Sequence, residues 1–127
     1  MKVVKTIFRV LIGIGIIYFI SIMVFVLKPD ISDFLNRTDF VSNEWIKWEE
    51  TESSFGVRWY MTHDLSHNYV LKGKTKKEIE EILGKPSSES KNEIRYYLGL
   101  TGHGINTGSL TFEFKNGRVI KFGIWQG

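Results

Sequence analysis

The chain has 127 residues, a formal net charge of +3 and no cysteine, which is the size of one domain with an appendage. The absence of cysteine excludes disulfides, thiolate nucleophiles, zinc–thiolate sites and lipidation at an N-terminal cysteine. From Lys28 onward basic and acidic residues balance at 14 each, so the soluble part lacks the basic surface that nucleic-acid binding requires.

The N-terminal segment 1–28 predicts a membrane anchor. Val10 to Leu27 is a run of 18 uncharged, mostly apolar residues, about 27 Å long as a helix and sufficient to cross a bilayer core. A cleaved signal peptide is the alternative, but bulky residues from Phe25 to Leu27 occupy the positions where cleavage needs small ones. Basic residues precede the run and acidic residues follow it. The positive-inside rule therefore predicts a single-pass protein of the cell membrane, with a cytoplasmic N-terminus and the C-terminal domain outside, periplasmic or extracellular.

Residues 29–56 predict an acidic, aromatic arm between the membrane and the domain. Its start, from Ile31 to Leu35, has the apolar spacing of a short interfacial helix. Two interpretations of its rings stay open: they cover one face of a small sheet, or they form a partner-binding patch. The excess of acidic residues indicates a solvated linker or internal charge complementarity, with a basic partner as the alternative. The aromatic residues are Phe34, Phe40, Trp45, Trp48 and Phe55.

Residues 57–127 predict the folded domain, whose first helix spans Arg58 to Tyr69 with Met61 and Leu65 on its apolar face. In this helix, His63 and His67 lie four residues apart in the sequence H-D-L-S-H. The spacing resembles the zinc motif H-E-x-x-H, although aspartate is one methylene shorter than glutamate and does not place a general base in the same position. A zinc site formed by these two residues and His103 is therefore an alternative function.

A second helix is specified between Gly73 and Pro86. Thr75 and Glu78 have the spacing of a capping box, while Gly84 predicts a left-handed C-cap. Gly73-Lys74-Thr75 also resembles the end of a nucleotide-binding P-loop, but that motif requires glycine at position 68, which is asparagine. No nucleotide and no other cofactor is expected.

Three strands follow, with apolar residues alternating around Tyr96, Phe112 and Phe122. The glycine-rich segment Thr101 to Gly108 predicts a wide connection between the first two. We expect a three-residue loop, Lys115-Asn116-Gly117, which places Phe112 opposite Ile120. The predicted buried face comprises Leu110, Phe112, Phe114, Ile120, Phe122 and Ile124.

The helix motif G-K-T-x-x-E-I-x-x-I-L-G-x-P, the strand Tyr96 to Gly99 and the hairpin Phe112 to Val119 together resemble small envelope domains related to the lipoprotein BamE (SmpA/OmlA). The resemblance covers residues 58–125. It implies an α+β fold with two short helices packed on a three-stranded antiparallel sheet, a shape shared with repeats of β-lactamase-inhibitor proteins. This chain departs from that family at its anchor, because the lipid-bearing cysteine is absent.

Domains of this kind act by contact, so the resemblance implies a non-catalytic interaction module that docks on another envelope protein. Its implied process is envelope assembly or maintenance. An inhibitor-like domain that blocks an enzyme is a further alternative. The expected contact residues lie outside the packed face: Trp125, His103, Asn106, and Trp45 or Trp48.

Overall fold

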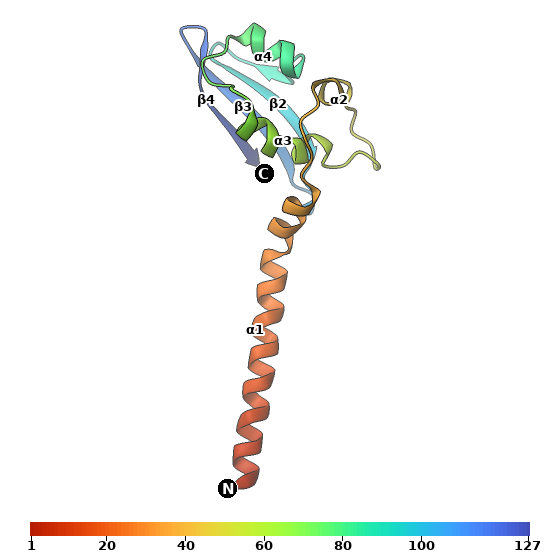
Figure 1. The fold of residues 1–127 in the computed structure, drawn as a ribbon, viewed down its shortest axis with the longest axis vertical. Coiled ribbons are helices and arrows are strands. Elements are labelled where there is room, and N and C mark those ends of the chain that lie inside the picture. The colour runs from red at the N-terminus through yellow and green to blue at the C-terminus, as the bar shows by residue number, and fades with distance from the viewer. The chain divides into compact units, whose positions relative to one another are not determined.

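A computed structural model describes all 127 residues, which divide into two compact units, 1–35 and 36–127. The first unit is formed by helix α1 (Lys2–Asn36), shown in red and orange in Figure 1. It is the one helix long and apolar enough to cross a membrane, a property that signal sequences share. Pro29 lies inside α1, and the segment from Ile31 to Leu35 continues the same helix. The expectation of a separate short helix there is wrong, since the proline removes one backbone donor without ending the helix.

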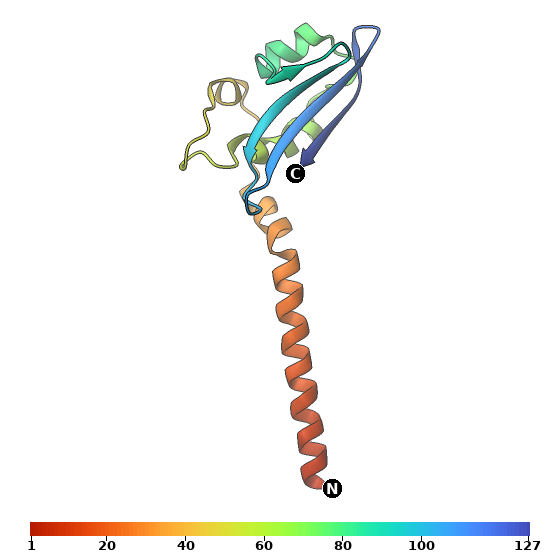
Figure 2. The same cartoon turned by 180° about the vertical axis from the view of Figure 1, so that it is seen from behind.

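The second unit is an α+β domain with three helices and a four-stranded antiparallel sheet in the order β1-β2-β3-β4. The expected three-stranded sheet is not confirmed, because a fourth strand, β1, pairs with β2 through Ser88-Glu89 and Ile94-Arg95. The helices cover one face of the sheet, and Figure 2 shows the opposite face uncovered. The elements are α2 (Ser42–Lys47), α3 (Val57–Asn68), α4 (Lys76–Leu83), β1 (Ser88–Glu89), β2 (Glu93–Leu100), β3 (Thr107–Lys115) and β4 (Arg118–Gln126).

Helix α4 begins as its sequence predicts. Thr75 Oγ1 accepts a hydrogen bond from the Glu78 amide at 3.3 Å, and Glu78 Oε2 accepts one from the Thr75 amide at 2.7 Å, which completes the capping box. At the other end Gly84 has φ 74° and ψ −164°, so φ is positive as expected while ψ is extended rather than left-handed helical. Ile79 and Leu83 are buried against the domain core.

The β3–β4 hairpin differs from the expected register. Lys115 pairs with Arg118, so the turn has two residues, Asn116 (φ 52°) and Gly117 (φ 74°), and both backbones are left-handed. An uninterrupted ladder from this turn would set Phe112 opposite Lys121, but a register shift after Phe114 places it opposite Phe122, and not opposite the expected Ile120.

A β-bulge keeps the apolar faces aligned despite the shorter turn. Glu113 pairs with Lys121 and Phe114 with Val119, which leaves Ile120 as an extra residue on β4. Ile120 is consequently 51% exposed, and Val119 replaces it in the core. The predicted buried face is wrong at Ile120 because alternation along a strand does not reveal an inserted residue.

The arm contributes two aromatic side chains to the domain core. Phe40 and Trp45 are both buried, and their rings meet edge to face with centroids 5.7 Å apart. Phe34 and Phe55 are exposed. The first interpretation of the arm is thus confirmed for Phe40 and Trp45, and a partner-contact role for Trp45 is excluded by its burial.

Replacement of Trp45 tests this packing. Because the side chain is completely buried, we predict that Trp45→Ala lowers the free energy of unfolding by about 3–5 kcal/mol. Trp45→Phe should cost clearly less, because the indole N–H has no hydrogen-bond partner to lose. Urea denaturation of the full-length protein in detergent measures both, with exposed Phe55→Ala as the control expected within about 0.5 kcal/mol of wild type. Equal effects at positions 45 and 55 would contradict the assignment of the arm to the core.

Candidate functional site

The candidate site is the face of the sheet that carries no helix, which we call the open face. Strand register aligns its residues in three rows across β2, β3 and β4. The rows are Tyr97–Ser109–Trp125, Arg95–Thr111–Gly123 and Glu93–Glu113–Lys121. The sequence thus places aromatic side chains at one end of the open face and charged side chains at the other.

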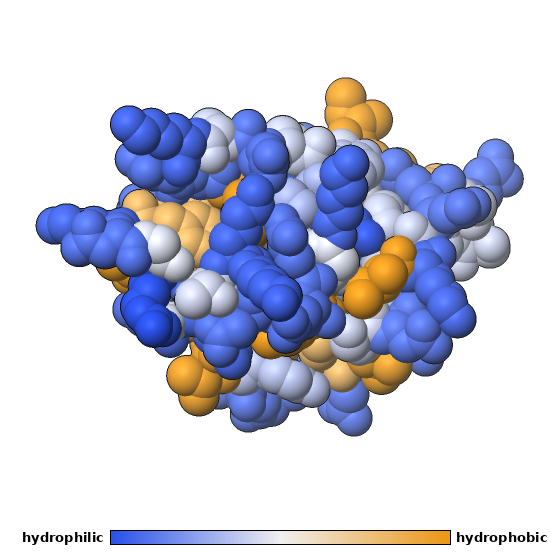
Figure 3. Space-filling view, turned by 90° about the horizontal axis from the view of Figure 1, so that it is seen from above, coloured by the Kyte–Doolittle hydropathy of each residue, from blue (hydrophilic) through white to orange (hydrophobic).

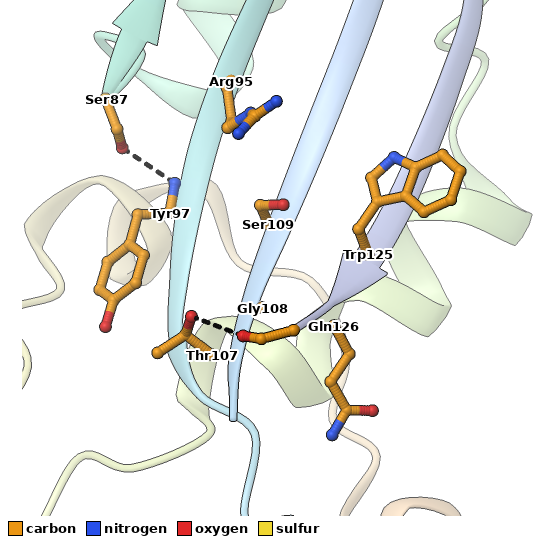
Figure 4. Close-up of a pocket in the computed structure, with 9 residues that line it drawn as sticks. Ser87, Arg95, Tyr97, Thr107, Gly108, Ser109, Trp125 and Gln126 are labelled. Atoms are coloured by element: carbon orange, nitrogen blue, oxygen red, sulfur yellow. Dashed lines mark hydrogen bonds between the residues drawn. The ribbon is translucent and has the colours of Figure 1, made fainter. Parts of the chain in front are cut away.

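The aromatic row borders a shallow hollow of about 340 Å³ (Figure 4). Tyr97 on β2 and Trp125 on β4 stand on either side, and the small residues Gly108 and Ser109 of β3 form the floor between them. Trp125 is 59% exposed and Tyr97 is 37% exposed. The hollow therefore presents two aromatic rings, with the small residues Gly108 and Ser109 of β3 between them.

Charges on the open face pair mainly with one another. Lys121 and Glu113 form an ion pair at 3.4 Å, and Glu93 accepts a hydrogen bond from Arg95 at 3.5 Å. These pairs are exposed, so each contributes little to stability. Their positions leave the aromatic end free of a strong net charge, which suits a mixed apolar and hydrogen-bonding contact.

The arm fixes Tyr97 in place. The Tyr97 hydroxyl donates to Glu50 Oε2 at 2.9 Å, and Glu50 Oε1 accepts from the Leu100 amide at 2.8 Å. Burial raises the pKa of Tyr97, and the hydrogen bond to Glu50 raises it further. The ring therefore remains a neutral hydroxyl donor at physiological pH. The sequence predicted a strand that contains Tyr97, but it identified neither Tyr97 nor Arg95 as a site residue.

The other predicted contact residues lie at separate places. Trp48 is half-buried over Gly99, where an added Cβ would lie 2.7 Å from the indole. His103 is half-buried with its ring 6.4 Å from that of Trp59, and Asn106 is exposed in the same loop. Of the five expected residues, only Trp125 lies on the open face.

The structure does not bring His63, His67 and His103 together in one site. His63 and His67 stack with ring centroids 4.2 Å apart, and His67 Nδ1 donates to the His63 carbonyl oxygen at 2.7 Å. Loss of hydration lowers the pKa of His63, and the neighbouring Arg37 and His67 lower it further. No group of three histidine, aspartate or glutamate side chains is placed to hold a metal ion, so the zinc alternative gains no support.

Asp64, the acidic residue between these histidines, instead attaches the arm to α3. Its Oδ2 accepts from the Phe40 amide at 2.8 Å, and its Oδ1 accepts from Asn68 Nδ2 at 2.5 Å. The hydrogen bond from Phe40 and then that from Asn68 lower the pKa of Asp64. The motif H-D-L-S-H thus contains a residue with a structural role.

Comparison of the chain with protein-family models, curated proteins and solved structures finds no match. The functional proposal therefore rests on the geometry of the domain and on the length and apolar character of α1.

The lowered pKa of Asp64 gives a pH-dependent prediction. A carboxylate with a lowered folded-state pKa stabilises the fold above its ordinary value of 3.8, and this contribution is lost as the pH falls through the folded-state value. Asp64→Asn should therefore lower the urea midpoint of the full-length protein at pH 7, and the difference from wild type should shrink below about pH 4. A difference that stays constant from pH 7 to pH 3 would contradict the role of the ionised carboxylate.

Proposed function

We propose that this chain is a single-pass membrane protein that presents a small, non-catalytic protein-interaction domain on the outer side of the cytoplasmic membrane. Its partner is another envelope protein, and its process is envelope assembly or maintenance. The proposal assigns the open face, with Trp125, Tyr97 and Arg95, as the contact surface.

One observation carries the proposal: the domain buries one face of its sheet under helices and leaves aromatic residues exposed on the other. Tryptophan, tyrosine and arginine are the residue types that contribute most to binding free energy at protein interfaces. The end of the domain with α4 and the β3–β4 turn differs from the open face in the character of its surface. In Figure 3 it is mainly hydrophilic, and its apolar side chains are scattered rather than gathered in one patch.

The location follows from the anchor. Lys2, Lys5 and Arg9 precede the apolar run of α1, whereas Asp30 and Asp33 follow it. By the positive-inside rule this distribution favours a cytoplasmic N-terminus and an outer C-terminal domain.

The resemblance to BamE-like domains is compatible with the helices on one face of an antiparallel sheet and with the capped helix α4. The additional strand β1 is only two residues long. A shared architecture supports a shared mode of action less strongly than a shared site does, so the function rests chiefly on the open face.

Capture of the partner tests the proposal. Full-length protein is purified from its own membranes after mild cross-linking, with α1 alone as the control bait. A stoichiometric envelope protein that requires residues 36–127 is the expected result. Recovery of no such protein in repeated trials would contradict the proposed function.

A substitution locates the contact. We predict that Trp125→Ala weakens binding of the recovered partner by about 10- to 30-fold, as expected for a central aromatic contact worth about 1.4–2 kcal/mol. Phe55→Ala removes another exposed ring and should leave binding unchanged. Both variants must keep the wild-type urea midpoint. Equal binding by the two variants would remove the open face from the proposal.

A further inference from the structure

The two edges of the sheet differ in how far their outward backbone groups are hydrogen-bonded. The outer edge of β2 is covered: β1 pairs with its first half, and side chains bond the rest. Ser87 Oγ accepts from the Tyr97 amide at 2.9 Å, Arg58 donates to the Tyr97 carbonyl at 2.9 Å, and Glu50 accepts from the Leu100 amide. Coverage of this kind prevents an edge strand from pairing with another chain.

The outer edge of β4 is covered only at its start. The Val119 amide donates to the Lys74 carbonyl, and the Val119 carbonyl accepts from the Gly73 amide, both at 2.9 Å. At the far end, Gly127 exchanges two hydrogen bonds with Thr107, so Gly127 faces β3. Because backbone direction alternates along an antiparallel strand, the amides and carbonyls of Phe122, Ile124 and Gln126 face outward.

This outward edge has few of the features that protect edge strands. Between Lys121 and Gln126 there is no proline, and the one charged residue, Lys121, pairs with Glu113 on the open face. Phe122 and Ile124 pack against the core but are only partly buried. Figures 1 and 2 both show β4 as the outermost strand along this stretch.

We propose that β4 pairs antiparallel with β4 of a second copy of this chain, about a two-fold axis at Ile124. In this register Ile124 faces Ile124 of the second copy, and Phe122 faces its Gln126. The outward amides and carbonyls then satisfy one another in about six hydrogen bonds. Such a self-complementary contact closes after two copies, because the same surface is used by both.

The side chains fit this register on both faces. On the helix side, Phe122 and Ile124 of the two copies adjoin and complete each other's burial. On the open face, Trp125 lies opposite Gly123 of the second copy, which has no side chain to obstruct the indole. The two Lys121 residues are separated by roughly 20 Å, since their positions along the paired strands differ by six residue steps, and they do not repel.

The pairing also extends the candidate site. The aromatic row of each copy then continues into the Arg95–Thr111–Gly123 row of the second copy, and the two Trp125 side chains become diagonal neighbours on the combined open face. A membrane anchor favours this contact because it confines both copies to one surface and raises their effective concentration. The inference goes beyond the proposed function, since it does not depend on a different envelope protein.

Cysteine cross-linking tests the pairing, because the native chain has no cysteine. Ile124→Cys and Ile120→Cys are each introduced into the full-length protein in membranes and treated with a short thiol-specific cross-linker. Position 124 faces itself in the proposed register, whereas the two copies of position 120 lie roughly 27 Å apart. We expect at least about fivefold more cross-linked dimer for Ile124→Cys than for Ile120→Cys. Equal yields would overturn the proposal, as would cross-linking of position 124 mainly to a different protein.

A second pair of variants tests the backbone contact. In the Ile124→Cys background, Gln126→Pro removes one outward amide, which makes no bond to β3. Gln126→Ala keeps that amide, and both variants lose the 2.9 Å bond from Gln126 Nε2 to Thr101 Oγ1. We expect cross-linking to fall with proline and to persist with alanine, with wild-type circular dichroism for both. Equal cross-linking by the two variants would overturn strand pairing. The cross-linking result does not depend on whether an envelope partner is recovered. The proposed partner contact and the proposed pairing of two copies can therefore be contradicted independently.

Discussion

The position of Arg58 is the constraint on which the rest of the domain depends. Its guanidinium donates to the Trp45 carbonyl at 3.0 and 2.8 Å and to the Tyr97 carbonyl at 2.9 Å. It also lies 5.1 Å from the Trp45 ring centroid and 4.9 Å from that of Trp48. Burial lowers the pKa of Arg58, but an arginine in this setting remains charged. One side chain on α3 therefore joins the arm, the helix layer and the edge of β2.

This contact explains why the arm belongs to the fold. A sheet with two short helices offers limited apolar surface, and small domains bury a smaller fraction of their chain than larger ones. The arm supplies Phe40 and Trp45 to the core, and Asp64 and Glu50 bond it to α3 and β2. Among the acidic residues of the arm, Glu50 thus has defined internal partners, but these are neutral hydrogen-bond donors, so internal charge complementarity stays a prediction.

The same arrangement divides the sheet into a structural side and an accessible side. Helices and arm cover one face and the outer edge of β2, and these contacts leave the open face and the edge of β4 from Phe122 to Gln126 accessible. Trp125 belongs to both accessible regions, because it projects from the open face and comes from the edge strand. The proposed partner contact and the proposed pairing of two copies therefore meet at one residue.

The sequence by itself determined the features that depend on neighbouring residues: the apolar run of α1, the capping box of α4 and the alternation that assigns Phe112 and Phe122 to one face. It also indicated Trp125 as a candidate contact. It did not determine the bulge at Ile120, because an extra strand residue is recognised only when the partner strand is present. Nor did it distinguish buried Trp45 from half-buried Trp48, identify Asp64 as the arm's attachment, or single out Arg95 and Tyr97. These outcomes were decided by the tertiary structure, since each depends on contacts between residues far apart in the chain.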